Sequence, residues 1–194
     1  MEQSELDIIN AMLSAIGDFP VIDLADEEDS ASNIDADVLK ARTLLRTLNS
    51  EQQARGWWFN TETWEFVPAA EEVILPTNCL RIKDSVQYTN RTGKLYDVAS
   101  HTYTIEETVE LPVVLELGYE ALPYSFYAYL KAMACLRFFM NEDGDREQVS
   151  MLSSAMAEHY KLVQDEDISH KAPNIFSGNP TVSQVLNGLT NRRQ

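Results

Sequence analysis

The 194-residue sequence contains only two cysteines and no long apolar run. Cys79 and Cys135 lie far apart, and Cys135 falls within an apolar, helix-like stretch, so no disulfide framework is indicated and synthesis in a reducing compartment is expected. No apolar stretch approaches the roughly 18 residues that a membrane-spanning helix needs, so we expect no membrane insertion. The acidic N-terminus, residues 1–5, does not fit a secretory signal peptide.

Basic residues are also scarce, at 15 against 31 acidic ones, and the net charge is −16. Proteins that hold nucleic acid or anionic membranes use clustered Lys and Arg, so such binding is not expected of the chain body. Residues 1–40 hold 11 acids and one base, whereas residues 171–194 hold three bases and no acid. The run Asp26, Glu27, Glu28 and Asp29 is interpreted either as a solvated loop or as a patch that repels DNA or attracts a basic partner.

The sequence lacks the common catalytic and ligand-binding motifs. Its three histidines, His101, His159 and His170, stand in no metal-ligand pattern, and no paired-cysteine zinc motif occurs. Phosphate-binding glycine motifs and a nucleophile elbow are absent too. We therefore expect no cofactor, no metal and no enzymatic activity, and we expect Cys135 to be a small core residue.

Four segments show helical periodicity, and 44% of all residues are hydrophobic, enough for a substantial core. Ser4 is placed to cap the first helix and Gly17 to end it, while Ser32 with Asp35 forms a weak capping box before the second. The third segment is apolar nearly all round, which predicts either a central helix of a bundle or one covered by a neighbouring subunit. The predicted helices span residues 3–17, 34–55, 123–140 and 145–167.

Between the second and third helices, β-branched and aromatic residues occur in short runs broken by turn signals. The turn at residues 89–93 predicts a hairpin, and Pro112 predicts an edge strand or a break within 109–117. The predicted strands span residues 57–67, 72–75, 79–83, 86–90, 94–98, 102–106 and 109–117. The fold class is therefore α+β: a four-helix bundle with a β-rich module inserted between helices 2 and 3.

We expect the chain to be organised as residues 1–56, helices 1 and 2; 57–121, the inserted module; 122–169, helices 3 and 4; and 170–194, an extended C-terminal arm. The last segment cannot build a core of its own. Two interpretations stay open, a disordered terminus and an arm that becomes ordered on a neighbouring chain. The candidate anchors of the arm are Ile175, Phe176, Val182, Val185, Leu186 and Leu189.

Several blocks in this order resemble one family, the tail tubular protein A of short-tailed bacteriophages of the T7 type. The first block is the helix containing Asn10, Leu13 and Gly17, followed by Pro20 and Val21. The second, which resembles the pattern QxxGWxFN, contains Gln53, Gly56, Trp57, Phe59 and Asn60. The remaining blocks are Leu75–Pro76 with Leu80, Arg91–Gly93–Leu95–Tyr96–Asp97, and Leu122–Pro123 with Tyr129, Ala132 and Phe138.

The resemblance implies a structural virion protein, made in the host cytoplasm, that forms a dodecameric adaptor ring beneath the portal protein. Its implied partners are copies of itself, the portal, the tail nozzle protein (tail tubular protein B) and the tail fibre, while DNA passes through without specific binding. Under this interpretation Asp26, Glu27, Glu28 and Asp29 are candidate channel-lining acids and the C-terminal arm contacts the portal. Two alternatives are a virion-associated peptidoglycan hydrolase and a non-catalytic, chaperone-like binding module.

Overall fold

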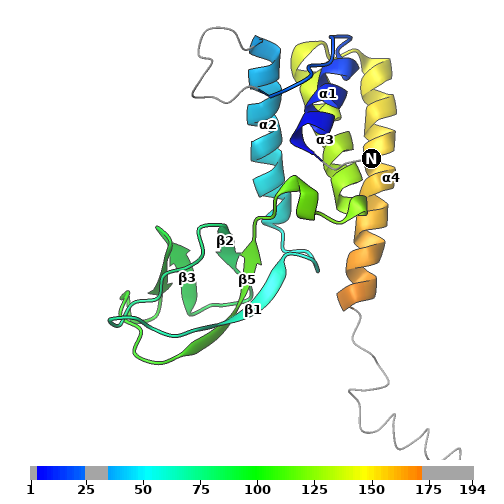
Figure 1. Ribbon diagram of the computed structural model, residues 1–194. Helices are drawn as coiled ribbons and strands as arrows, with labels where there is room; N and C mark the ends of the chain where they lie inside the picture. Colours follow the sequence, from blue (N-terminus) through cyan, green and yellow to red (C-terminus); the bar gives the residue numbers. More distant parts are fainter. Residues whose placement is uncertain (1–3, 25–34, 172–194) are drawn as a thin grey trace, which may run out of the picture.

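A computed structural model describes residues 4–24 and 35–171 of the chain. It confirms the α+β class, because four helices form a bundle and a β-rich module lies between the second and the third (Figure 1). The helices are α1 (Glu5–Ala15), α2 (Ala36–Gln53), α3 (Tyr124–Glu142) and α4 (Arg146–Lys171), with the 3-10 turn η1 (Tyr119–Ala121) before α3. The strands are β1 (Thr61–Phe66), β2 (Cys79–Ile82), β3 (Tyr88–Arg91), β4 (Lys94–Asp97) and β5 (Val109–Leu115).

Polar side chains begin the first two helices. The Ser4 hydroxyl accepts a hydrogen bond from the Asp7 amide at 3.2 Å, which confirms the predicted cap of α1. Gly17, with φ at +83°, takes the left-handed conformation just after α1 ends. The carboxylate of Asp35 caps α2 through the Asp37 amide at 2.9 Å. Ser32, the other half of the predicted capping box, lies outside the described residues.

Helix α3 is the centre of the bundle and packs against α1, α2 and α4 (Figure 1). This position explains its apolar surface, because ten of its 19 residues are buried by the chain itself. Of the two predicted roles, the central one is confirmed. The outer helix α4 differs, since Val163 is its one buried residue and the side turned away from α3 is exposed.

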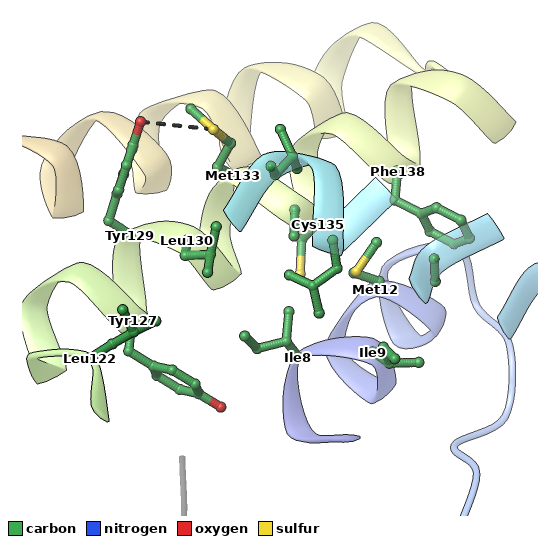
Figure 2. Packing of buried hydrophobic residues seen from close by; sticks show 14 of the residues in the cluster. Ile8, Ile9, Met12, Leu122, Tyr127, Tyr129, Leu130, Met133, Cys135 and Phe138 are labelled. Atoms are coloured by element: carbon green, nitrogen blue, oxygen red, sulfur yellow. Dashed lines mark hydrogen bonds between the residues drawn. The ribbon is translucent and has the colours of Figure 1, made fainter. Parts of the chain in front are cut away.

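The bundle core consists of large apolar side chains from all four helices. Figure 2 shows Ile8 and Met12 of α1 lying beside Leu130 and Cys135 of α3. Each fully buried Leu, Ile or Phe contributes about 1.5–3 kcal/mol through removal of apolar surface from water. The fully buried aromatic rings of this core are Phe126, Tyr129 and Phe138.

The inserted module holds a three-stranded antiparallel sheet, in the order β1–β5–β2, and a β3–β4 hairpin. It has its own apolar core around Leu95 and Val113, both completely buried. The hairpin turn is confirmed: Thr92 and Gly93 have φ of +55° and +78°, and the Gly93 amide donates to the Asn90 side chain. The segments predicted as strands at 72–75 and 102–106 instead form isolated bridges.

The prediction that Pro112 marks an edge strand or a break is wrong, because β5 lies between β1 and β2. Proline lacks an amide hydrogen and is normally absent from central strands. Here its carbonyl accepts from the Lys83 amide at 2.8 Å, one residue beyond the end of β2. The amide hydrogen bond that proline cannot make therefore falls where the neighbouring strand has already ended.

Candidate interaction surfaces

A buried polar joint connects the bundle to the β-rich module. The Gln53 side chain, at the end of α2, donates to the Leu117 carbonyl at 2.9 Å and accepts from the Leu117 amide at 2.8 Å. The completely buried Asn60 side chain donates to the carbonyls of Gln53 and Leu115 and accepts from the Trp57 amide. The Asn60 bonds are buried and the Gln53 bonds are partly buried, so breaking one would leave a polar group unpaired away from bulk water. These bonds therefore hold together the two chain crossings between the modules.

Three basic side chains satisfy the exposed carbonyls at the C-terminus of α2. Arg81 of the sheet donates to the carbonyls of Ala54, at 2.6 Å, and Arg55, at 2.9 Å. The ammonium groups of Lys83 and Lys171 both donate to the Gly56 carbonyl. Cations at a helix C-terminus are favourable because unpaired carbonyls there carry partial negative charge. This part of the molecule is thus a structural junction between α2, the sheet and the end of α4.

Trp58 fixes the last turn of α4 against the junction. Its amide donates to the Asp167 carboxylate at 2.9 Å, and its ring stacks on His170 with an interplanar angle of 2°. Lys171 also pairs with Asp167 at 2.7 Å. The point at which the chain leaves α4 for its C-terminal segment is therefore defined by contacts with the 57–59 loop.

The end of the bundle farthest from the β-rich module is acidic (Figure 1). It combines the C-terminus of α3, the N-termini of α2 and α4, and the loop after α1. Two bases, Lys40 and Arg146, occur in the same segments, and Lys40 pairs with Asp37 and Glu142. We call this surface the acidic end; its described acids are Asp18, Asp23, Asp35, Asp37, Glu142, Asp143, Asp145 and Glu147.

The outer face of α4 exposes apolar side chains. Met151 is 69% exposed and Leu162 is 55% exposed, and Ala155 lies between them on the same side of the helix. Near the start of α4, six residues line an open hollow of about 510 Å³: Asp145, Glu147, Gln148, Met151, Leu152 and Ala155. We call the side containing Met151, Ala155 and Leu162 the outer face of α4.

The candidate site residues from the sequence lie outside the described residues. The acids Asp26, Glu27, Glu28 and Asp29 belong to the segment that leads to Asp35, where α2 begins at the acidic end. The arm residues Ile175, Phe176, Val182, Val185, Leu186 and Leu189 follow Lys171, where the described part of the chain ends. Their roles stay predictions.

A partly exposed ion pair between two helices of the bundle was not anticipated from the sequence. Asp7 of α1 accepts hydrogen bonds from Lys131 at 2.9 Å and from the Tyr127 hydroxyl at 2.7 Å, both on α3. Partial burial opposes ionisation of Asp7, but these bonds outweigh it and hold the pKa of its carboxyl below the ordinary value. The cluster ties the start of α1 to α3, and only the pairing of two helices distant in sequence brings it together.

The cysteines occupy structural positions. Burial raises the pKa of the Cys135 thiol to about 11, so the thiol is protonated at neutral pH and a poor nucleophile. Burial also raises the pKa of the Cys79 thiol. Within residues 4–24 and 35–171, no group of three His, Cys, Asp or Glu side chains is arranged to hold a metal ion. None of the helices in this part of the chain is long and apolar enough to span a bilayer.

The family model described as Tail tubular protein matches residues 6–188 of this chain. This chain belongs to the tail tubular protein family. It is also similar to tail tubular protein A of Klebsiella phage KP34, with 29% identity over 161 residues, covering 81% of this chain and 82% of that protein. The resemblance seen in the sequence is thereby confirmed.

As a member of the tail tubular protein family, the chain is a structural phage tail protein located in the virion, where it assembles with other tail proteins. The fold gives one of its resembling blocks a physical role. Gln53, Gly56, Trp57 and Asn60 all lie at the joint between bundle and β-rich module. The block therefore encodes the connection between the two parts of this tail protein.

Proposed function

We propose that this protein is the subunit of an adaptor ring that joins the portal to the tail nozzle and encloses part of the DNA ejection channel. Its membership of the tail tubular protein family carries the proposal. The two ends of the subunit differ in chemistry, with an acidic helical end opposite a β-rich module (Figure 1). An adaptor needs such a difference, because it meets one partner above the ring and another below it.

A closed ring is a heterologous assembly, in which one side of each subunit contacts a different side of the next. Helices α2 and α4 lie on different sides of the central α3 and are available for such contacts (Figure 1). The side of α2 exposes Leu39 beside Lys40, whereas the outer face of α4 exposes Met151 and Leu162. Two unlike sides of this kind support a ring, and the family resemblance indicates twelve subunits.

We propose that Asp26, Glu27, Glu28 and Asp29 line the channel. They precede the N-terminus of α2 at the acidic end, where the described acids outnumber the bases eight to two. A negative wall repels the phosphate backbone, keeps the duplex away from the protein and allows it to slide. DNA would then pass through without specific binding.

The C-terminal arm contacts the portal, and the nozzle protein and tail fibre lie on the other side of the ring. The arm leaves the described structure at Lys171, beside Trp58 and the β-rich module. Its anchors Ile175 and Phe176 lie only a few residues beyond that point, so the junction positions the arm for contact with a neighbouring protein.

The mass and symmetry of the purified protein, alone and mixed with purified portal, test this proposal. Native mass spectrometry and electron microscopy should show a twelve-subunit ring attached to the portal. An equimolar mixture with an unrelated acidic protein serves as the control for charge-driven association. A protein that stays monomeric and never binds the portal under these conditions would refute the ring.

A further inference from the structure

The outer face of α4 carries an apolar stripe separate from the one that packs on α3. Residues 151, 155 and 162 are separated by four and seven positions, so they lie on one side of the helix. The large members, Met151 and Leu162, are 69% and 55% exposed, and the hollow of about 510 Å³ lies beside Met151. The buried Val163 points instead toward the bundle core. The exposed Glu158 lies on the same side between Ala155 and Leu162, so the surface suits an occupant with both apolar and basic side chains.

The C-terminal segment has a matching pattern. Val182, Val185, Leu186 and Leu189 follow the i, i+3, i+4, i+7 spacing, which places all four on one side of a helix. Thr181 and Gln184 match the sequence pattern of a capping box at the start of this spacing. An amphipathic helix laid against an apolar groove is a recurring mode of recognition.

The linker is long enough for the segment to return to the α4 of its own subunit. Residues 172–181 can extend to about 33–36 Å. From Lys171 back to Ala155 is 16 residues of α4, a rise of about 24 Å. Because a short tether gives an effective concentration in the millimolar range, docking within one subunit is favoured over docking between subunits in dilute solution.

Charge sets the direction in which the segment would lie. Arg192 and Arg193 follow Leu189, and Asp145 and Glu147, at the start of α4, are among the residues that line the hollow. When the segment runs antiparallel to α4, its apolar residues pass from Leu162 toward Met151. Both arginines then reach the acids at the start of α4.

We propose that residues 182–193 dock antiparallel on the outer face of α4 of the same subunit. The apolar side chains cover Met151, Ala155 and Leu162, and Arg192 and Arg193 lie beside Glu147. This inference concerns the isolated subunit and does not depend on the adaptor function. In the proposed ring, where the outer face of α4 contacts the next subunit and the arm contacts the portal, the segment must first leave this surface.

Disulfide trapping in the full-length protein tests the docking. In the double variant Ala155→Cys with Leu186→Cys, oxidation should form a disulfide within one chain, at a rate independent of protein concentration. The matched control is Ala157→Cys with Leu186→Cys, because Ala157 is also exposed but faces away from the stripe. Both native cysteines are buried and serve as unreactive background.

The expected result is trapping at least tenfold faster in the Ala155 variant than in the Ala157 variant. Adding Arg192→Glu and Arg193→Glu to the Ala155→Cys, Leu186→Cys variant should slow disulfide formation severalfold at low salt. Adding Glu147→Arg to that protein should restore part of the rate. Equal rates in the two cysteine variants would overturn the proposal. Disulfides that form only between chains would overturn it as well, because they would assign the surface to a second copy.

Discussion

The side chain of Gln53 pairs with both backbone polar groups of Leu117. The amide nitrogen donates to the Leu117 carbonyl at 2.9 Å and the amide oxygen accepts from its N–H at 2.8 Å, so the glutamine acts like one residue of a neighbouring strand. Gln53 is completely buried and ends α2, whereas Leu117 leads from β5 toward α3. One side chain therefore holds together the entry to the β-rich module and the exit from it.

Replacing Gln53 by Ala should lower the free energy of unfolding by about 2–3 kcal/mol. The substitution leaves the partly buried amide of Leu117 without a partner, leaves its carbonyl with only a long 3.5 Å bond from Asn49, and creates a small cavity. Chemical denaturation followed by circular dichroism measures the effect. Gln164→Ala is the control, since Gln164 is exposed on α4 and its loss should change stability by less than about 0.5 kcal/mol. Equal stabilities for the two variants would contradict the role of the joint.

Gly56→Ala should be more destabilising than Gly93→Ala by about 1–3 kcal/mol. Both glycines have positive φ, +79° and +78°, so both variants carry the same backbone strain. A Cβ at position 56 would meet Val114 at 3.0 Å and the Arg81 guanidinium at 3.2 Å, whereas a Cβ at position 93 meets nothing within 4 Å. The difference between the two variants therefore isolates the cost of crowding at the junction. Thermal denaturation of both variants checks this, and indistinguishable melting temperatures would count against it.

Asp97 should contribute stability that is lost at low pH. A hydrogen bond from Gln87, with others from the amides of Ser100 and Ala99, lowers the pKa of its carboxyl from 3.8 to about 2. A depressed folded-state pKa favours the folded protein above about pH 4, and the contribution disappears as the pH falls toward 2. Asp97→Asn should therefore show a shallower loss of stability over this window in denaturation curves. If the stability of this variant falls as steeply between about pH 4 and pH 2 as that of the wild type, other carboxyl groups are responsible for the loss.

Replacing Asp26, Glu27, Glu28 and Asp29 with Lys should slow DNA ejection severalfold or cause the assembled ring to retain DNA. Positive side chains on a channel wall attract phosphates and release counterions, so the duplex would bind instead of sliding. Ejection from assembled particles into buffer, followed by dye fluorescence, provides the measurement. The control makes the same charge change on exposed acids of the β-rich module, Glu65, Glu106, Glu107 and Glu110. Wild-type ejection kinetics in the variant of Asp26, Glu27, Glu28 and Asp29 would refute the placement of these acids on the channel wall.

Deleting residues 172–194 should weaken binding to the portal at least tenfold while leaving the fold intact. The deletion removes the apolar anchors of the arm but retains Lys171 and its contacts with Gly56 and Asp167. Sedimentation with purified portal measures binding, and the melting temperature reports on the fold. A milder variant, Ile175→Ser with Phe176→Ser, should lose part of the affinity. Unchanged binding in both proteins would contradict the portal contact.

Local chemistry made much of the fold predictable. Ser4 and Gly17 bound the first helix because capping bonds and left-handed turns involve only neighbouring residues. The apolar surface of α3 predicted either a central position or cover by a neighbouring subunit, and only the structure decided for the first. The strands at 72–75 and 102–106 were wrongly predicted, because a strand depends on a partner with matching register, and these segments find only single bridges.

The contacts that join the modules could not be predicted in the same way. Three of these contacts join residues that are 26 to 124 positions apart. They are Arg81 with the C-terminal end of α2, Trp58 with Asp167, and Lys131 with Asp7. In the sequence, no local pattern distinguishes these residues from other polar or aromatic ones. Their partners are defined only once the helices and the sheet have packed.

The sequence by itself determined the α+β class, the four helical segments, the insertion point of the β-rich module and the family, because periodicity, caps and ordered blocks of residues are written along the chain. The tertiary structure alone decided that Pro112 sits in a central strand, that Gln53 and Asn60 form a buried joint, and that α4 keeps an exposed apolar stripe. The physical reason is how far apart along the chain the interacting residues lie. A cap or a turn is settled by residues within a few positions, whereas burial and pairing depend on surfaces that meet only in the folded chain.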